Sequence, residues 1–285
     1  MGLSSDATSR IGHGRVLTMC LFLVIAGCGD TSDEPPLATS QATSRARAEL
    51  PPENGTFDYQ LGGGYAPADD VVVLSRDRTE APDPDRYNIC YVNGFQTQPN
   101  EADLWLSDHP ELLLRDDAGS LLVDPEYPDE YILDTTSADS RRQLTGIVGD
   151  WIDGCAADGF QAIEIDNLDT YSRFSDQLNE DDAVEYVRGL ADRAHSAGLA
   201  IGQKNSAELL SRRSETQLDF AVVEQCNEFD ECGEFTDVFG GQVYVIEYDR
   251  SAFEDGCAEY SDLSIVFRDV EVSTPGSATY LRESC

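Results

Sequence analysis

The chain has 285 residues, of which 55 are acidic and 19 are basic, so its formal net charge is −36. So large an acidic excess excludes a nucleic-acid-binding protein, because phosphate contacts require a basic face. The excess is explained either by solubility, including adaptation to a salty medium, or by attraction for a cationic substrate.

Residues 1–28 are typical of a lipoprotein signal peptide. Arg10 and Arg15 precede an apolar run, residues 16–26, that is too short to span a bilayer as a stable helix. The run ends in Ile-Ala-Gly-Cys28, which resembles a bacterial lipobox, the signal in which cleavage precedes a lipidated cysteine. An ordinary secretory signal cut near Ala26 is the alternative. Both predict an exported protein, which contacts the cell envelope membrane only through a lipid anchor at Cys28 or is secreted.

Residues 29–56 are rich in Ser, Thr, Pro, Ala and charge and show no apolar periodicity. Such a segment cannot bury enough apolar surface to fold, so we expect a disordered linker. Residues 57–285 are then one catalytic domain of the usual size of a barrel. We expect this domain to be monomeric.

Short apolar segments rich in β-branched residues alternate with helical segments in this domain, which predicts an α/β fold, a (β/α)8 TIM barrel. The Glu101–Leu122 region is a longer insertion without a clear strand. Phe57–Leu61 is either an additional N-terminal strand or the true first strand, with the last strand then extra. The eight strands predicted are Val71–Ser75, Tyr87–Val92, Tyr131–Leu133, Ala162–Ile165, Ala200–Gly202, Phe220–Val223, Val243–Ile246 and Ser264–Phe267.

Two amphipathic stripes predict helices that pack against the sheet. The first ends before Gly159, and the second begins at a cap formed by Asp181 or Asp182 and ends at Gly198. The first stripe is Leu144, Ile147, Val148, Trp151, Ile152 and Cys155, and the second is Ala183, Val184, Val187, Leu190, Ala191 and Ala194.

Six cysteines remain after Cys20 and Cys28, an even number that predicts up to three disulfides in an exported protein. Six cysteines allow 15 pairings. We favour Cys226 with Cys232, which closes a short loop after a strand, Cys257 with Cys285, which fixes the C-terminus, and Cys90 with Cys155. A metal site is the weaker alternative, since the chain has three histidines and no Cys-x-x-Cys, and we predict no metal.

Polar side chains follow nearly every predicted strand, at the end of the barrel where active sites of this fold lie. A packed barrel end does not require such a ring, and buried charges are costly unless they are paired. The ring therefore predicts a polar mouth that binds sugar. Its members include Asp77, Asn93, Asp134, Glu164, Asp166, Asn167, Lys204, Asn205, Glu224, Glu247 and Tyr248, together with Arg76, Gln203, Gln225, Asp249, Arg268 and Asp269.

Lys204 is the only lysine in the chain, although arginine occurs 18 times. A compact ammonium group at a strand end can bind a sugar hydroxyl or keep a nucleophilic carboxylate ionised. A chance surface lysine and a Schiff-base lysine are the alternatives.

Four segments resemble glycoside hydrolase family 114, whose members are endo-α-1,4-polygalactosaminidases. The resemblance covers residues 57–270 and is most specific where Glu164-Ile-Asp166-Asn167 and Gln203-Lys204-Asn205 stand in this order on strand ends. The other two segments are Phe57-Asp-Tyr-Gln-Leu and Val222-Val-Glu224-Gln-Cys226. The family's first motif usually begins with Trp, where this chain has Phe57, a smaller ring for stacking at that end.

The resemblance implies an Asp nucleophile at the end of the fourth strand and a carboxylate acid/base at the end of the sixth, which are Asp166 and Glu224 here. Cleavage requires one carboxyl that is protonated near neutral pH and one that stays ionised. We expect Lys204 to keep the pKa of Asp166 low, and desolvation behind an apolar strand to raise the pKa of Glu224. We expect retention of anomeric configuration.

No cofactor is needed for this chemistry, and the expected partner is a polysaccharide, cationic if it is a deacetylated amino-sugar polymer. We expect Asp77, Asn93, Asp134, Glu164, Asn167, Lys204, Asn205, Glu247 and Tyr248 to bind it. Tyr65, Tyr91, Trp105 and Tyr248 are candidates for stacking on sugar rings or for core packing. The alternatives are a non-catalytic polysaccharide-binding lipoprotein and a barrel glycosidase that acts on a different α-glycan.

Overall fold

The computed structural model describes residues 48–285. The predicted signal peptide, Cys28 and the greater part of the predicted linker lie outside the described residues. No helix of the described part is both long and apolar enough to cross a membrane.

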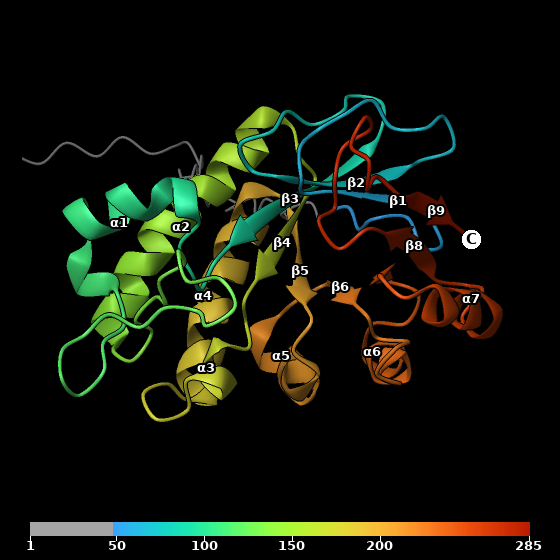
Figure 1. The fold of residues 1–285 in the computed structure, drawn as a ribbon. Helices are drawn as coiled ribbons and strands as arrows, with labels where there is room; N and C mark the ends of the chain where they lie inside the picture. The colour runs from blue at the N-terminus through green and yellow to red at the C-terminus, as the bar shows by residue number, and fades with distance from the viewer. Residues whose placement is uncertain (1–47) are drawn as a thin grey trace, which may run out of the picture. The chain divides into compact units, whose positions relative to one another are not determined.

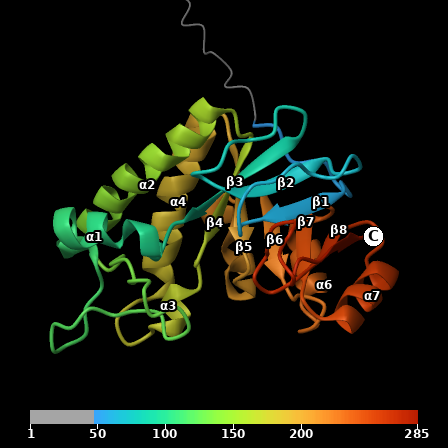
Figure 2. The same cartoon turned by 45° about the horizontal axis from the view of Figure 1, so that its top comes forward.

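Eight parallel strands follow one another around a single sheet in chain order, and a short antiparallel strand, β9 (Arg282–Ser284), pairs with the last of them. Because β1 also contacts β8, the sheet curves into a nearly closed barrel (Figures 1 and 2). The strands are buried along almost their whole length, as in parallel sheets generally. They are β1 (Phe57–Gln60), β2 (Val73–Asp77), β3 (Tyr87–Asn93), β4 (Ala162–Asp166), β5 (Ala200–Lys204), β6 (Phe220–Glu224), β7 (Val243–Glu247) and β8 (Ser264–Arg268). The predicted (β/α)8 barrel is confirmed.

Phe57–Gln60 is the true first strand, but the last predicted strand is not extra, since Ser264–Arg268 is β8 of the barrel. The prediction of a barrel strand at Tyr131–Leu133 is wrong. That segment belongs to the excursion between β3 and the next long helix, where it forms only isolated antiparallel bridges. Strand β4 pairs directly with β3, which leaves no position between them. Three apolar residues indicate an extended, buried segment, but so short a pattern carries no information on which strand it pairs with.

Helices α2 (Ala138–Asp158) and α4 (Glu180–Ala197) pack side by side against the sheet through the two predicted stripes (Figures 1 and 2). Both end at a glycine in the left-handed conformation, Gly159 and Gly198. The cap of α4 is Asn179, whose side chain accepts from the backbone N–H of Asp182, and not an aspartate. The other helices are α1 (Ala102–Asp108), α3 (Thr170–Arg173), α5 (Arg213–Thr216), α6 (Cys232–Phe239) and α7 (Arg250–Glu259). Within the described residues, loops and not helices connect β1 to β2 and β2 to β3.

Residues 48–56, which the sequence analysis placed in the linker, pack at the N-terminal end of the strands. Tyr87 and Tyr244, near the starts of β3 and β7, donate hydrogen bonds to the carbonyl oxygens of Glu49 and Pro52 at 2.6 and 2.7 Å. Leu50 packs against an apolar cluster inside the barrel that includes Phe57, Tyr87 and Tyr244. The barrel domain therefore includes residues before Phe57, because these few residues cover the N-terminal end of the barrel.

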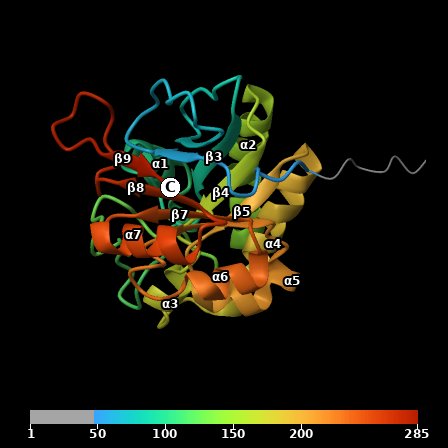
Figure 3. The same cartoon turned by 90° about the vertical axis from the view of Figure 1, so that its right-hand side faces the viewer.

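Side chains join β1 to β8 where the ring of strands closes. The guanidinium groups of Arg268 and Arg282 each lie 3.4 Å from Asp58 Oδ1, and Arg282 also donates to the carbonyl oxygen of Phe57. Asp58 and Arg268 are fully buried. Figure 3 shows β9 and the C-terminus beside β8 at this junction.

Within residues 48–285 three disulfides are present, and they are the three that the sequence analysis favoured. Cys90–Cys155 links β3 to α2, and Cys257–Cys285 fixes the C-terminus to α7. Cys226–Cys232 closes the loop that follows β6. This last bridge stands two residues after Glu224, so it constrains the chain next to the candidate site.

Candidate active site

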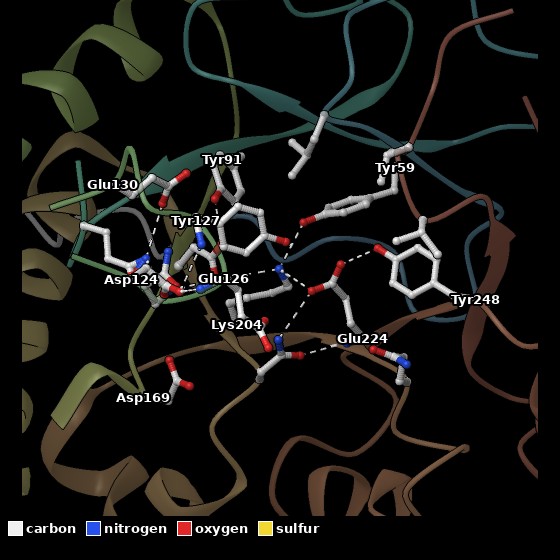
Figure 4. Close-up of a pocket in the computed structure, with 18 of the residues that line it drawn as sticks. Tyr59, Tyr91, Asp124, Glu126, Tyr127, Glu130, Asp169, Lys204, Glu224 and Tyr248 are labelled. Carbon is white, nitrogen blue, oxygen red and sulfur yellow. Dashed lines mark hydrogen bonds and ion pairs between the residues drawn. The ribbon is translucent and has the colours of Figure 1, made fainter. Parts of the chain in front are cut away.

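A cavity of about 530 Å³ opens at the C-terminal ends of the strands. Its volume lies in the usual range of ligand pockets, roughly 300–1,000 Å³. Polar and charged groups predominate in its lining (Figure 4). The lining residues are Tyr59, Leu61, Tyr91, Gln96, Asp124, Glu126, Tyr127, Glu130, Asp166, Asn167, Asp169, Arg173, Lys204, Asn205, Glu224, Gln225, Tyr248, Val270 and Val272.

Strand β4 places Glu164 inside the barrel and Asp166 at its mouth, on the same side because strand side chains alternate. Glu164 is fully buried and accepts hydrogen bonds from Tyr59 at 2.8 Å and Ser75 at 2.5 Å. Burial, opposed by Lys204, raises its pKa to about 7. Asp166 accepts from the Tyr91 hydroxyl at 2.6 Å and from its neighbour's backbone N–H at 2.7 Å.

Lys204, the last residue of β5, lies at the centre of the site. Its ammonium nitrogen is 3.0 Å from Glu224 Oε2 and 3.7 Å from both Asp166 Oδ1 and Glu164 Oε1. It also donates to the Tyr59 hydroxyl at 3.2 Å. Burial by itself lowers the pKa of an ammonium, but these three carboxylates outweigh it and hold the pKa of Lys204 well above its usual range.

Glu224, the last residue of β6, receives three more contacts besides Lys204. Tyr248 donates to its Oε1, the side-chain amide of Asn205 approaches Oε2 at 3.5 Å, and the Asn205 side-chain oxygen accepts from the backbone N–H of Glu224 at 2.8 Å. Burial raises the pKa of this carboxyl, but Lys204 and the hydrogen bonds from Tyr248 and Asn205 more than offset it, so the pKa is lowered. The expectation of a raised pKa is therefore wrong, because the lysine expected beside Asp166 lies nearer to Glu224.

The backbone turns sharply after each of these three strands. The residues that follow β4, β5 and β6 are Asn167, Asn205 and Gln225, with φ values of 64°, 45° and 59°. Such values are uncommon for residues other than glycine, although asparagine tolerates them better than most. The backbone therefore turns away from the cavity directly after each strand, and the side chain of the last strand residue still faces the cavity.

The outer wall comes from the excursion between β3 and α2, and the sequence analysis missed it. Asp124 is buried and pairs with Arg173, while Glu130 accepts from Gln96 at 3.3 Å and Asn93 at 3.4 Å. Burial is the main reason that the pKa of Glu130 is raised to about 7. Because these residues do not follow a barrel strand, the prediction based on strand ends did not include them.

Five predicted substrate-binding residues do not line the cavity, and one of them, Glu164, is fully buried inside the barrel. Asp77 and Asp134 instead accept from hydroxyl and backbone groups of the turns that follow them. Asn93 is buried behind Glu130, and Glu247 accepts from the backbone N–H of Asn227 at 2.9 Å. Of the predicted stacking residues, Tyr91 and Tyr248 line the cavity, Tyr65 does not, and Trp105 is a core residue.

Among residues 48–285, one group of potential metal ligands converges, namely Cys226, Cys232 and Glu247. The two cysteines are joined in a disulfide, so their sulfurs are not available as thiolates. The side chains around Lys204 are held by one another and by tyrosines. Of the three carboxylates around Lys204, those of Asp166 and Glu224 line the cavity, and such a pair is the equipment of acid/base and nucleophilic chemistry.

The sequence model of glycoside-hydrolase family GH114 matches residues 37–285. No curated protein sequence matches this chain. The chain is similar to Aspergillus fumigatus Ega3, solved in complex with galactosamine, with a TM-score of 0.66 and 20% sequence identity. The superposition covers 85% of this chain and 100% of Ega3. The chain is also similar to the glycoside hydrolase domain of PelA from Pseudomonas aeruginosa, with a TM-score of 0.51 and 11% sequence identity. The superposition covers 78% of this chain and 97% of the PelA domain. At these identities the likeness to solved structures establishes a shared fold.

Proposed function

The chain belongs to glycoside hydrolase family GH114, and on this premise we propose that it is an exported, endo-acting enzyme that cleaves α-1,4-linked galactosamine-containing polysaccharide. Asp166 is the nucleophile and Glu224 the acid/base in this proposal. The observation that carries it is the position of Lys204, whose single ammonium group contacts both carboxylates inside the cavity.

The two hydrogen bonds that Asp166 accepts fix the orientation of its carboxylate toward the cavity. In the first half of the reaction, Asp166 attacks the anomeric carbon while Glu224 gives a proton to the departing glycosidic oxygen. In the second half, Glu224 takes a proton from water, and that water breaks the bond between Asp166 and the sugar.

The lowered pKa of Glu224 means that the free enzyme holds this residue as a carboxylate, the form needed in the second half. The first half needs the protonated form, so Glu224 takes up a proton when substrate binds. We expect an activity optimum on the acidic side of neutrality, and net proton uptake on binding that calorimetry in buffers of different ionisation enthalpy measures.

The contacts of Lys204 favour retention of configuration. The two carboxylate oxygens that it approaches, at 3.0 and 3.7 Å, lie no farther apart than these two distances combined. That limit on the two oxygens suits the separation of roughly 5–5.5 Å between the carboxyl groups of retaining enzymes better than the roughly 6.5–9.5 Å of inverting ones. Proton NMR of the first product formed decides between the two outcomes.

Acidic residues in the cavity suit a polymer that carries ammonium groups. Asp124, Glu126, Glu130 and Asp169 line the wall opposite Glu224, and Arg173 is the one arginine there. Ega3, which shares the fold, was solved with galactosamine. These two facts support galactosamine as the sugar and give the net charge of −36 a function in attracting the substrate.

Export is supported by the three disulfides, which form and persist in oxidising compartments. Lipid anchoring at Cys28 remains a proposal from the sequence. The Cys28→Ser variant is expected to lose the lipid and to leave the membrane fraction, and mass spectrometry of the mature N-terminus tests this.

The purified domain is incubated with α-1,4-galactosamine oligomers, and Asp166→Asn and Glu224→Gln are each expected to lower kcat by at least about 10²–10⁴-fold. Asp134→Asn is the matched control, since this carboxylate lies outside the cavity and should leave kcat unchanged. Cleavage that survives both active-site substitutions overturns the roles assigned here. Binding without cleavage by the wild type supports a polysaccharide-binding lipoprotein instead, and cleavage only of another α-glycan supports a different barrel glycosidase.

A further inference from the structure

Gln203 stands directly before Lys204 on β5, and its side chain lies on the other face of the strand, because strand side chains alternate. It is fully buried and does not line the cavity, although the sequence analysis counted it in the polar ring at the barrel mouth. On the same face, Ile201 packs in the apolar cluster that also contains the buried residues of α2 and α4. A polar side chain in such a layer is stable only where its hydrogen bonds are satisfied.

The side-chain amide of Gln203 donates two hydrogen bonds to the turn that follows β5. Its nitrogen lies 2.8 Å from the carbonyl oxygen of Asn205 and 2.9 Å from that of Ser206. Two acceptors at one end of the amide establish that this end is the nitrogen. The oxygen at the other end is buried and has no hydrogen-bond partner within residues 48–285. Because an unpaired buried oxygen opposes folding, the position of this amide is explained by the turn that it holds.

The turn adopts a conformation that its residues do not favour. Asn205 and Ser206 have φ values of 45° and 60°, so two consecutive residues with side chains lie in the left-handed region. A Cβ atom makes this region unfavourable, and serine tolerates it less well than asparagine. Such a conformation persists only where surrounding contacts impose it, and the two bonds from Gln203 are contacts of that kind. The carbonyl oxygen of Ser206 accepts a further bond from the backbone N–H of Leu209 at 3.0 Å.

The conformation of this turn decides where the side chain of Asn205 lies. Its side-chain oxygen accepts from the backbone N–H of Glu224 at 2.8 Å, and its amide nitrogen lies 3.5 Å from Glu224 Oε2. The backbone N–H of Asn205 donates to the carbonyl oxygen of Val222 at 3.1 Å, so main chain and side chain together join this residue to β6. Release of the turn changes the backbone angles of Asn205 and moves its side chain relative to Glu224, which contacts Lys204 in the cavity (Figure 4).

We propose that Gln203 is a positioning residue for hydrolysis, which holds the turn after β5 in its left-handed conformation and so keeps Asn205 in contact with Glu224. This inference rests on the proposed function, in which Glu224 is the acid/base. Gln203 does not line the cavity and forms no hydrogen bond with its carboxylates, so it acts through Asn205. Glycine adopts the left-handed region without a steric cost. A glycine in place of Ser206 should therefore preserve the turn even where the amide of residue 203 has been removed.

The kinetic test compares the wild type with Gln203→Met, which keeps the length of the side chain and removes the amide. On α-1,4-galactosamine oligomers, kcat should fall about 10-fold or more, the effect of losing one hydrogen bond to a charged group, while KM changes by less than about threefold. Adding Ser206→Gly to Gln203→Met should recover most of the lost kcat, with Ser206→Gly alone as the reference.

The matched control is Gln242→Met, because Gln242 also carries a buried, unpaired amide oxygen but stands before β7, at the opposite end of the barrel. This control should keep kcat within about twofold of the wild type. An equal loss of kcat in Gln203→Met and Gln242→Met, or a loss that Ser206→Gly does not recover, overturns the positioning role.

Hydrogen exchange measured by NMR follows the same contact without turnover, at the backbone N–H of Glu224. Because this N–H donates to the side chain of Asn205, its exchange should become at least about 10-fold faster in Gln203→Met. Exchange should be slow again after Ser206→Gly is added, and Gln242→Met should not change it. Gln203→Glu offers at most one hydrogen in place of two and should shift exchange in the same direction, so it replaces the Met variant if that variant does not fold.

Unchanged exchange at Glu224 in the Gln203 variants refutes the positioning role, whether or not the enzyme is active. If the wild type cleaves no oligomer, the proposed function is wrong, and exchange at Glu224 still decides whether Gln203 positions Asn205.

Discussion

The ammonium group of Lys204 lies 3.0 Å from Glu224 and 3.7 Å from Asp166, so the only lysine of the chain is closer to the proposed acid/base than to the proposed nucleophile. This relationship explains why the pKa of Glu224 is lowered in spite of its burial. It also ties the protonation of Glu224 to the position of a single side chain. In the proposed roles, the free enzyme therefore holds Glu224 as the carboxylate that the second half of the reaction requires, and Glu224 must take up a proton from solvent before the first half.

Replacing Lys204 by Met should raise the pKa of Glu224, because the nearest positive charge is lost while the burial remains. In the pH profile of kcat/KM, the limb at high pH reports loss of the proton from the acid of the free enzyme. That limb should move to higher pH in the variant, and kcat should fall because the ammonium no longer holds the two carboxylates together. A limb that stays in place would show that Lys204 does not set the protonation of Glu224.

Tyr248→Phe removes the hydrogen bond to Glu224 and leaves the ring in place. Hydrogen bonds to charged groups contribute about 1.5–3 kcal/mol, which corresponds to a loss of roughly 10–100-fold in kcat/KM if the bond acts in the transition state. Tyr65→Phe is the control, since Tyr65 donates a hydrogen bond at 2.9 Å to another carboxylate, Asp58, outside the cavity. It should lower the urea midpoint of unfolding and leave kcat/KM nearly unchanged. Equal kinetic losses in both variants would contradict the specific role of Tyr248.

Glu164 should make the protein less stable as pH rises. Its pKa is about 7 in the folded state and 4.5 in the unfolded reference, so the folded protein binds this proton more tightly. The stabilisation is fully present below pH 4.5 and is lost as pH rises through about 7, a change on the order of 3 kcal/mol. Glu164→Gln cannot ionise, so the slope of unfolding free energy against pH should be shallower in this variant. Urea denaturation at pH 4.5, 6 and 7.5 measures both slopes, and parallel slopes would refute the pKa assigned to Glu164.

The disulfides should contribute unequally to stability and activity. Cys90–Cys155 joins residues 65 apart and Cys226–Cys232 residues 6 apart, so loop-closure entropy predicts losses of about 4 and about 2 kcal/mol when each is replaced by an alanine pair. The short bridge follows Glu224 directly, so its removal should lower kcat more than removal of the long bridge does. Thermal unfolding and kcat for the two double-alanine variants check both rankings. If removal of the long bridge causes the larger loss both in stability and in kcat, the short bridge has no role in positioning Glu224.

Several features followed from local pattern alone. The strands β4 to β8 and the stripes of α2 and α4 were predicted within one or two residues, because apolar periodicity and glycine caps act over a few positions. Two disulfide pairs were predicted correctly from loop length and position in the chain, and Cys90 with Cys155 was the pair that remained. The segment Tyr131–Leu133 is predicted to be a strand because it is apolar, but the backbone segments with which it pairs depend on residues remote in sequence.

The sequence by itself determined the family, the barrel and the ring of polar residues at its mouth, since parallel strands present their last side chains on one edge. Only the tertiary structure decided which members of that ring meet. Asp77, Asp134 and Glu247 do not line the cavity, whereas Asp124 and Glu130, from the excursion between β3 and α2, do. Lys204 lies nearer to Glu224 than to Asp166. The reason is physical: a side chain's pKa and contacts depend on distances of a few ångströms across the barrel, and those distances are set by packing between strands that are remote in sequence.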